Sequence, residues 1–359
     1  MSRAEDLRAA RESRAGAAER VNRRGPGDAV TRMVDAAVHR ATRHPVQNLR
    51  PGWRRCSTVD TGPAPLGPDF RAAMRTANAR IDALDLAELR TPAGTVRYLD
   101  VGDGPPVLLV HGIFGGPDAA MRQLRSLVPG GFRLIVPSRF GYLGSSLPAR
   151  ATPARQADVF ADLLDGLGIE KAAVVAVSAG ATSALQFALR HRDRVSSLAL
   201  LSPNGPGWQH ERRRMPYRIA RALWGSDRLM WTVRRHFRDR LARLVAVPGG
   251  QPLRAVDHAR LDAELDGVFP LSRRVNGALF DAFVSNPDIN ACDLADISTP
   301  TLIVHARDDA LAPCWGGIAL SERIPGARLL VVEHGGHLML GEHPEVAAAV
   351  EALLRSTQD

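Results

Sequence analysis

Three residue types that together support nucleophilic catalysis each follow an apolar run in this chain of 359 residues. Ser178 follows AAVVAV (172–177), a pair of aspartates follows TLIVHA (301–306), and a histidine-rich stretch follows ARLLVVE (327–333). A serine hydroxyl needs a neighbouring base to take its proton. Histidine suits that task because imidazole titrates near neutral pH, and a carboxylate can hold its tautomer. The order serine, aspartate, histidine therefore predicts serine-based acyl chemistry.

The residue types alone leave two choices open. Asp308 and Asp309 both lie in the position for the acid, and three histidines, His334, His337 and His343, compete for the role of base. A further candidate group follows the run VLLV (107–110): His111, Gly112 and Ile113 come directly after it.

The elements that must position these residues alternate along the chain. Apolar runs predict strands at 87–91, 95–102, 107–112, 132–137, 172–177, 196–202, 301–306 and 327–333. Helical patterns are expected at 69–82, 118–128, 152–167, 180–191, 315–323 and 344–355. Alternation of this kind is typical of an α/β fold with a mostly parallel sheet covered on both sides. Working residues in such sheets lie at the carboxyl ends of the strands, where Ser178, the aspartates and the histidines are expected.

The pattern is interrupted twice, which predicts three parts. Residues 1–68 are rich in Arg, Ala, Gly and Pro and are expected to form an N-terminal arm, partly helical or disordered. The α/β core is expected over 69–203 and 297–359. Between its two pieces, residues 204–296 contain a long stretch with apolar residues at helical spacing (218–247), which predicts an inserted helical lid.

The net charge of +9 invites a nucleic-acid interpretation, which the composition does not favour. Of the 47 basic residues only Lys171 is a lysine, a bias that fits GC-rich codon usage. The basic segments lack a zinc-finger pattern or an aromatic strand motif that reads nucleic acid, so we expect no nucleic-acid partner.

Other features of the sequence indicate where in the cell the protein is located. Cys56, Cys292 and Cys314 are far apart and form no metal-spaced or redox pair. The first residues lack a signal-peptide apolar core, and no apolar run is long enough to span a membrane. The sequence thus predicts a cytoplasmic protein without integral membrane association.

Five motifs in this order make the chain resemble a lid-bearing α/β-hydrolase over about residues 85–357. They are VHGIFGG (110–116), PSRFGYLGSS (137–146), AVSAG (176–180), HARDDALAP (305–313) and EHGGHLMLGEHP (333–344). One position departs from the family's Gly-x-Ser-x-Gly turn, because Ala176 stands where the first glycine is usual. The strained turn needs small residues two before and two after the serine. Alanine adds one methyl group, and Gly180 is retained.

The resemblance implies a role for particular residues. Ser178 would be the nucleophile, and the Gly-Gly before His337 selects that histidine as the base. The family's spacing from aspartate to proline fits Asp309 and Pro313, which leaves Asp308 as an expected solvated turn residue. The resemblance further implies an oxyanion hole formed by the backbone N–H groups of Ile113 and Ala179, with Phe114 replacing Ile113 if the loop is shifted. His111 would be structural.

The resulting expectation is an enzyme, a serine hydrolase that cleaves an ester or related acyl bond through an acyl-enzyme. Its substrate would be a small, largely apolar molecule, with Phe114, Trp208 and Trp231 lining the pocket. Alternatives are carbon–carbon bond hydrolysis of a diketone in aromatic degradation, acyl transfer, cofactor-free perhydrolysis, and a non-catalytic binding protein on the same fold. The motifs predict no cofactor and no metal. Weak contact of the arginine- and aromatic-rich lid with a membrane surface is a further alternative, and the sequence leaves the oligomeric state open.

Overall fold

The computed structural model describes residues 65–207, 215–245, 255–341 and 343–357. Most of the expected N-terminal arm (1–64) and the expected pocket residue Trp208 therefore lie outside the described residues. The division of the chain into an N-terminal arm, a core and a lid stays a prediction.

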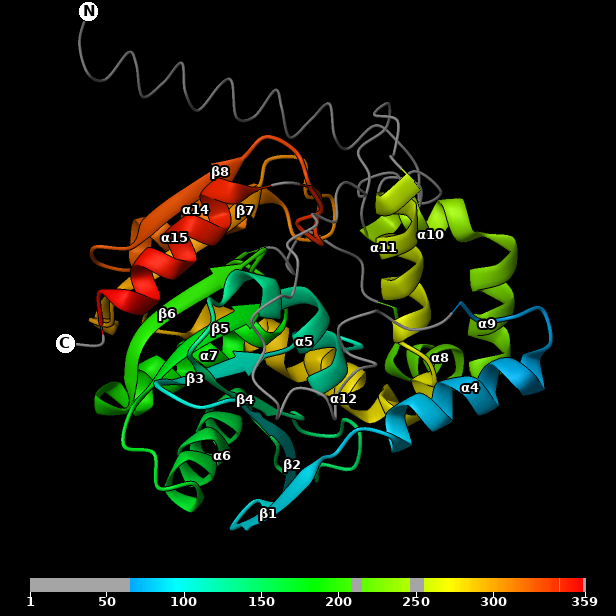
Figure 1. Ribbon diagram of the computed structural model, residues 1–359, viewed down its shortest axis with the longest axis horizontal. Coiled ribbons are helices and arrows are strands. Elements are labelled where there is room, and N and C mark those ends of the chain that lie inside the picture. Colours follow the sequence, from blue (N-terminus) through cyan, green and yellow to red (C-terminus); the bar gives the residue numbers. More distant parts are fainter. Residues whose placement is uncertain (1–64, 208–214, 246–254, 342, 358–359) are drawn as a thin grey trace, which may run out of the picture.

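An eight-stranded sheet, in the order β1-β2-β4-β3-β5-β6-β7-β8, forms the centre of the molecule (Figure 1). Only the pairings of β2 with β1 and β4 are antiparallel, and the strands from β4 to β8 are parallel. The expected mostly parallel α/β architecture is thus confirmed. The strands are β1 (Ala87–Thr91), β2 (Gly94–Val101), β3 (Pro106–Val110), β4 (Arg133–Pro137), β5 (Ala172–Val177), β6 (Val195–Leu201), β7 (Thr301–Ala306) and β8 (Arg328–Val332).

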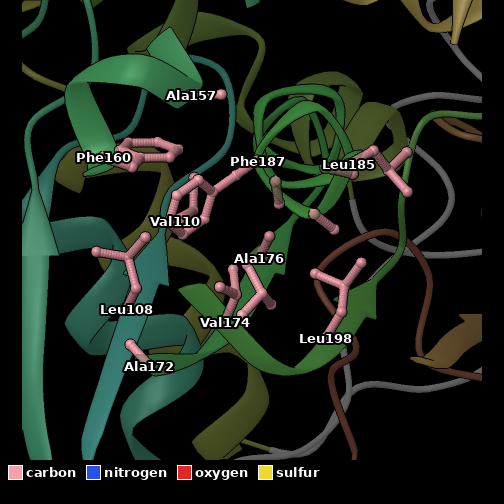
Figure 2. Close-up of a cluster of buried hydrophobic side chains, with 14 of the residues drawn as sticks. Leu108, Val110, Ala157, Phe160, Ala172, Val174, Ala176, Leu185, Phe187 and Leu198 are labelled. Carbon is pink, nitrogen blue, oxygen red and sulfur yellow. The ribbon is translucent and has the colours of Figure 1, made fainter. Parts of the chain in front are cut away.

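Two apolar clusters, one on each face of the sheet, form the core. Leu108 of β3 and Val174 of β5 pack on one face with Phe160 and Phe187, as Figure 2 shows. Alternate residues of the same strands, Leu109 among them, point to the other face. Strands buried on both faces must be apolar at every position, which is why the continuous apolar runs predicted these strands well.

Helices cover the two faces. α6 (Pro153–Gly166), α7 (Gly180–Arg190) and α14 (Cys314–Arg323) contribute to the first cluster, and α5 (Pro117–Leu124) and α15 (Pro344–Arg355) to the second. α4 (Phe70–Asp82) begins at Asp69, whose carboxylate caps it by accepting from the Ala72 N–H at 2.7 Å. Short 3₁₀ segments lie at Arg125–Leu127, Arg192–Arg194, Leu271–Arg273, Ile289–Ala291 and Leu294–Asp296.

Residues 204–296, here called the cap segment, connect β6 to β7 through helices. They are α8 (Tyr217–Trp224), α9 (Asp227–His236), α10 (Arg238–Val245), α11 (Ala255–Gly267), α12 (Val275–Phe280), a π-helical turn (Asp281–Ser285) and α13 (Asn286–Asp288). The stretch expected to be helical at 218–247 is divided at Gly225 and Phe237. In Figure 1, α8 to α11 gather to one side of the sheet together with α4. Among the described helices, none combines the length and the apolarity needed to cross a membrane.

Candidate active site

Ser178 lies on a sharp turn between a strand and a helix. β5 ends at Val177 and α7 begins at Gly180. The backbone of Ser178 has φ 52°, in the left-handed region that residues other than glycine rarely adopt. The turn persists because its backbone is bonded on both sides: Ser178 N–H donates to Leu201 O (3.0 Å) and Ala181 N–H donates to Ser178 O (2.9 Å). Such strain is typical of a residue held for function.

The space around this turn explains its small residues. A Cβ atom on Gly180 would lie 2.6 Å from His111 O and 2.8 Å from Val110 O, so only glycine fits there. Ala176, by contrast, is fully buried among apolar side chains of the first cluster (Figure 2). Its single methyl group therefore fits where the usual motif has glycine.

The three residues singled out from the sequence meet at the carboxyl ends of β5, β7 and β8. His337 Nε2 lies 2.8 Å from Ser178 Oγ, and His337 Nδ1 lies 2.8 Å from Asp309 Oδ2. His337 is 6% exposed and Asp309 is 5% exposed, so water competes little for these contacts. The arrangement forms a continuous chain from carboxylate to imidazole to hydroxyl, which can move a proton from the serine to the histidine.

The acid of this chain is held as a carboxylate. Asp309 Oδ1 accepts the Leu311 and Ala312 N–H groups, each at 2.8 Å. Burial alone would raise the pKa of Asp309, but the charge of His337 and hydrogen bonds from His305 and His337 hold that pKa well below its ordinary value. Asp309 therefore keeps its negative charge near neutral pH.

Sequence reasoning missed a second histidine beside the acid. His305, at the end of β7, is fully buried, and its Nε2 lies 2.7 Å from Ala312 O and 3.3 Å from Asp309 Oδ2. A Cβ atom on Gly317 would lie 2.6 Å from His305 Nδ1, so α14 closes over the ring. The sequence does hold a signal for this contact, the spacing of four residues between His305 and Asp309. Nothing in the apolar strand, however, indicates that a polar side chain at its end faces the acid.

Asp308 is not the solvated turn residue expected. Its side chain is only 13% exposed, and its Oδ1 accepts the Gly336 N–H at 2.8 Å, so it ties down the loop that carries His337. Burial raises the pKa of Asp308 above its ordinary value, against the hydrogen bond from Gly336. The competing histidines lie elsewhere: His334 pairs with Asp308 (3.4 Å), and His343 contacts Leu340 O (3.1 Å).

The loop after β3, residues 111–116, passes beside the serine. A Cβ atom on Gly112 would lie 3.0 Å from Ser178 Cβ. His111 Nε2 accepts the Arg139 N–H (3.1 Å), which leaves Nδ1 to donate to Gly112 O at 2.8 Å. Burial and the charge of Arg139 lower the pKa of His111 well below its ordinary value, so it is a neutral structural group.

Two backbone N–H groups near the serine are available for a ligand. The Gly115 N–H donates to Gly112 O (3.2 Å), and Phe114, with φ 57°, turns its N–H toward the Tyr142 hydroxyl. Neither the Ile113 N–H nor the Ala179 N–H donates to a protein acceptor within the part of the chain that the structure describes. These are the two donors that the sequence resemblance selected.

The expected pocket residues Phe114 and Trp231 belong to one apolar cluster. Phe114 packs edge to face against Trp224 (ring centroids 5.1 Å apart), a residue of α8 that the sequence analysis did not include in the pocket. Trp231 packs edge to face on Phe70 of α4 (5.7 Å) and shares an apolar cluster with Phe114. Both aromatic side chains therefore belong to the contact between the cap segment, α4 and the loop 111–116.

A separate cavity of about 210 Å³ adjoins His337. Its walls come from α5 and the 3₁₀ turn after it, the loop after β8, α15, and Arg260 of α11. Leu124, Val177, Leu201 and Met339 make much of the lining apolar, and neither Phe114 nor Trp231 lines it. As for a metal, no group of three or more His, Cys, Asp or Glu side chains in the described ranges is arranged to hold one.

Comparisons with known proteins identify the family of the chain. The family model for the alpha/beta hydrolase fold matches residues 105–344. The chain is 31% identical to a 2-hydroxy-6-oxononadienedioate/2-hydroxy-6-oxononatrienedioate hydrolase of Pseudomonas putida, over 70% of this chain and 87% of the relative. It is 28% identical to a 2-hydroxymuconate semialdehyde hydrolase of the same species, over 68% and 85% of the two chains. An alpha/beta hydrolase fold protein from Nakamurella multipartita superposes with a TM-score of 0.60 at 28% identity, covering 76% of this chain and 99% of that one. The family model matches more than half of the chain, from β3 to the start of α15, and this range includes Ser178, Asp309 and His337. The chain belongs to the α/β-hydrolase fold family.

Proposed function

We propose that the protein is a serine hydrolase that cleaves an ester or related acyl bond of a small, largely apolar substrate. The observation that carries this proposal is the continuous contact from Asp309 through His337 to Ser178, with both hydrogen bonds at 2.8 Å. A serine on a strained turn, a buried imidazole and a charged carboxylate are the parts that activate a hydroxyl.

The reaction follows from these contacts. His337 Nε2 takes the proton of Ser178 Oγ as the oxygen forms a bond to the substrate carbonyl carbon. The tetrahedral intermediate collapses, the bond to the leaving alcohol breaks, and the alcohol leaves with the proton from His337. A water molecule then gives a proton to His337 and attacks the carbonyl carbon of the acyl-serine. The bond from that carbon to Ser178 Oγ breaks, the acid leaves, and His337 returns the proton to Oγ, which restores the hydroxyl. Asp309 remains a carboxylate throughout and holds the imidazole in place.

The negative charge that develops on the carbonyl oxygen needs donors fixed in advance. The Ile113 and Ala179 N–H groups suit this role, because both lie next to Ser178 in the chain or in space and neither donates to a protein acceptor in the described structure. The Phe114 N–H suits it less, since it faces Tyr142. We therefore place the oxyanion hole on Ile113 and Ala179.

Substrate binding is assigned to the apolar surroundings of the triad. Phe114 with Trp224 on the cap side and the mostly apolar cavity beside His337 favour a substrate with an apolar acyl or alcohol group. The cap segment supplies none of the three triad residues, so we expect it to select substrates rather than to perform the chemistry.

The proposal is tested by labelling with a fluorophosphonate probe, which reacts with an activated serine. The wild type should be labelled at one site, and Ser178→Ala should lose both the label and the esterase activity, by a factor on the order of 10⁴ or more. Cys292→Ala, a change at a thiol that contacts Gln186 far from the triad, is the matched control and should be labelled as the wild type is. Labelling that survives in Ser178→Ala would refute the assignment.

The names of the curated relatives favour a second candidate, hydrolysis of a carbon–carbon bond next to a carbonyl group. By name, one of the relatives described above hydrolyses 2-hydroxymuconate semialdehyde and the other 2-hydroxy-6-oxononadienedioate or 2-hydroxy-6-oxononatrienedioate, and each of these compounds carries an aldehyde or ketone group. The same nucleophile would attack a ketone carbonyl, and a carbon leaving group would take the proton. Acyl esters of graded chain length, assayed beside a vinylogous diketone, separate the two: a kcat/KM that is at least tenfold higher on the diketone would replace the ester proposal.

A further inference from the structure

Two buried arginines hold the loop 111–116 at its two ends. Arg139, which follows β4, donates from Nε to His111 O at 2.9 Å. Arg274, at the start of α12 in the cap segment, donates from Nη1 to Gly115 O at 2.5 Å. Both side chains are fully buried, so neither carbonyl group has water as an alternative partner. The loop that carries the Ile113 N–H thus lies between two guanidinium groups.

Each of these arginines is paired with a carboxylate across the boundary between core and cap segment. Arg139 of the core forms two hydrogen bonds of 2.6 Å with Asp281 of the cap segment. Arg274 of the cap segment reaches Asp118 of α5 at 2.8 and 3.1 Å. In the first pair the arginine belongs to the core and the carboxylate to the cap segment, and in the second pair the reverse holds. In both pairs the same guanidinium group donates to the loop and to the carboxylate.

The loop has little freedom to move away from Arg274. A Cβ atom on Gly116 would lie 2.8 Å from Arg274 Nη1 and 2.5 Å from Leu143 Cδ1. One on Gly115 would lie 2.8 Å from Gly112 O. The backbone of Gly115 and Gly116 is therefore packed against the guanidinium, and Gly115 is packed in turn against Gly112 O, so the shape of the loop depends on where that group lies.

Asp118 is ionised in its pair with Arg274. Burial would raise the pKa of Asp118, but the charges of Arg274 and Arg122 hold it well below its ordinary value. Asp118 thus stays ionised, and a charged partner fixes the direction of Arg274.

We propose that Arg274 is a positioning residue for the oxyanion hole: by bonding Gly115 O and Asp118 at once, it holds the loop so that the Ile113 N–H faces the carbonyl oxygen that becomes charged. This inference rests on the proposed function. Ile113 lies two residues before Gly115, and an oxyanion donor acts only within a narrow range of distance and direction. A residue of the cap segment then contributes to stabilisation of the transition state without touching the substrate.

A purely structural role for Arg274 makes a different prediction, and Arg122 provides the matched control. Arg122 also pairs with Asp118 (3.3 Å) and is nearly buried, but its other side-chain partner is Glu264 rather than a carbonyl group of the loop. Arg122→Gln removes one positive charge from beside Asp118, as Arg274→Gln does, and leaves the bond to Gly115 O in place.

The experiment measures kcat and KM on a small soluble ester for Arg274→Gln, Arg274→Lys and Arg122→Gln. It adds the affinity of each protein for a trifluoromethyl ketone, which binds the serine as a charged tetrahedral adduct. For Arg274→Gln we expect kcat to fall about 10- to 100-fold with KM within about twofold, since loss of one whole donor costs roughly 10²–10³. The ketone affinity should fall by the same factor as kcat. Arg274→Lys should recover part of both, and Arg122→Gln should change kcat less than threefold.

Three outcomes overturn the proposal. One is a rise in KM at unchanged kcat, the second is an equal kcat loss in Arg122→Gln, and the third is a kcat loss without loss of ketone affinity. If Arg274→Gln does not fold, Arg274→Lys carries the same comparison, with a smaller parallel loss expected. Fluorophosphonate labelling of wild-type Ser178 keeps the two proposals apart, because its absence counts against the serine mechanism and its presence with unchanged Arg274 kinetics counts against the positioning role alone.

Discussion

In the sheet, β5 pairs with β3 and β6 through backbone hydrogen bonds, and the side chains of the paired residues are all apolar and all buried. Where the cap segment meets the core, the fully buried groups include Arg139, Arg274 and Asp281. The first region gains stability from apolar area removed from water, which has no direction. The second depends on charges that must each find a partner, since a buried charge without one is strongly destabilising.

The two regions differ in what they can specify. Apolar strands fix the plane of the sheet and bring Ser178, Asp309 and His337 to one edge, but they tolerate small shifts. Directional ion pairs set the position of a loop far more narrowly. Both kinds of contact converge at the loop 111–116, whose first residue follows β3 and whose carbonyl groups bind the two arginines.

The largest expected effect lies on the core side. Asp309→Asn leaves the size of the side chain unchanged but removes the charge that holds His337, so kcat should fall by a factor on the order of 10³–10⁴. Asp308→Asn is the matched control: it weakens the bond to Gly336 and should cost less than about tenfold. Steady-state kinetics on one ester under identical conditions makes the comparison, and equal losses or a larger loss at Asp308 would reverse the assignment.

The sequence predicted the core better than the contacts around it, for a physical reason. The strands 172–177 and 301–306 coincide with β5 and β7, because burial on both faces leaves only apolar residue types. The candidate residues were found because they follow predicted strands, and parallel strands bring their carboxyl ends to one edge. The resemblance to the family then selected Asp309 and His337 among them.

The ion pairs between core and cap segment left no such pattern. Arg139 and Asp281 are 142 residues apart, and Arg274 and Asp118 are 156 apart, so no local periodicity links them. In a chain with 47 basic residues, almost all of them arginine, a buried arginine also looks like the many exposed ones. His305 was missed for a related reason. It lies at the end of an apolar strand, and the sequence does not reveal that its side chain faces Asp309.

A change in stability comes next in size. Arg139→Met leaves Asp281 buried, without its two hydrogen bonds from the guanidinium and with the Tyr142 hydroxyl as its remaining donor, and we expect it to lower the free energy of unfolding by about 3–5 kcal/mol. Adding Asp281→Leu removes the remaining charge and should recover part of that loss. Urea unfolding followed by circular dichroism measures both. Arg133→Met breaks a pair with Asp100 in which each side chain is 29% exposed, and it should cost no more than about 1 kcal/mol.

An equal cost for the buried and the exposed pair would remove the distinction between the two regions. So would a double variant no more stable than Arg139→Met, since the distinction assumes that the unpaired charge, rather than lost packing, causes the damage.

A smaller effect should appear in the dependence of stability on pH. The pKa of Asp118 is lower in the folded chain than its ordinary value of 3.8, so its stabilising effect is present above about pH 4 and is lost as the pH falls further. Asp118→Asn resembles the protonated residue and lacks that contribution. The free energy of unfolding should therefore differ between the two proteins by on the order of 2 kcal/mol at pH 6. The difference should narrow as the pH falls below about 4 and close only as the pH falls through the lowered pKa of Asp118. A constant difference as the pH falls would show that folding does not lower the pKa of Asp118.

The smallest expected effect concerns salt and the arginines of the cap segment. The cap segment carries arginines at 212–214, 234 and 235 that are candidates for recruiting an acidic substrate, and the first three lie outside the described residues. Arg234 is already bonded to Asp262 (2.7 Å) and Asp266 (2.8 Å), and Arg235 lies over the ring of Trp231.

Apolar capture of a neutral substrate does not depend on screening, whereas interactions of exposed charges weaken as the Debye length falls from about 10 Å at 0.1 M salt to about 3 Å at 1 M. KM for a neutral medium-chain ester should thus change less than about twofold between these salt concentrations, while Trp231→Ala and Trp224→Ala raise it. A steep rise of KM with salt, together with no effect of the two tryptophan changes, would instead assign substrate capture to the charges of the cap segment.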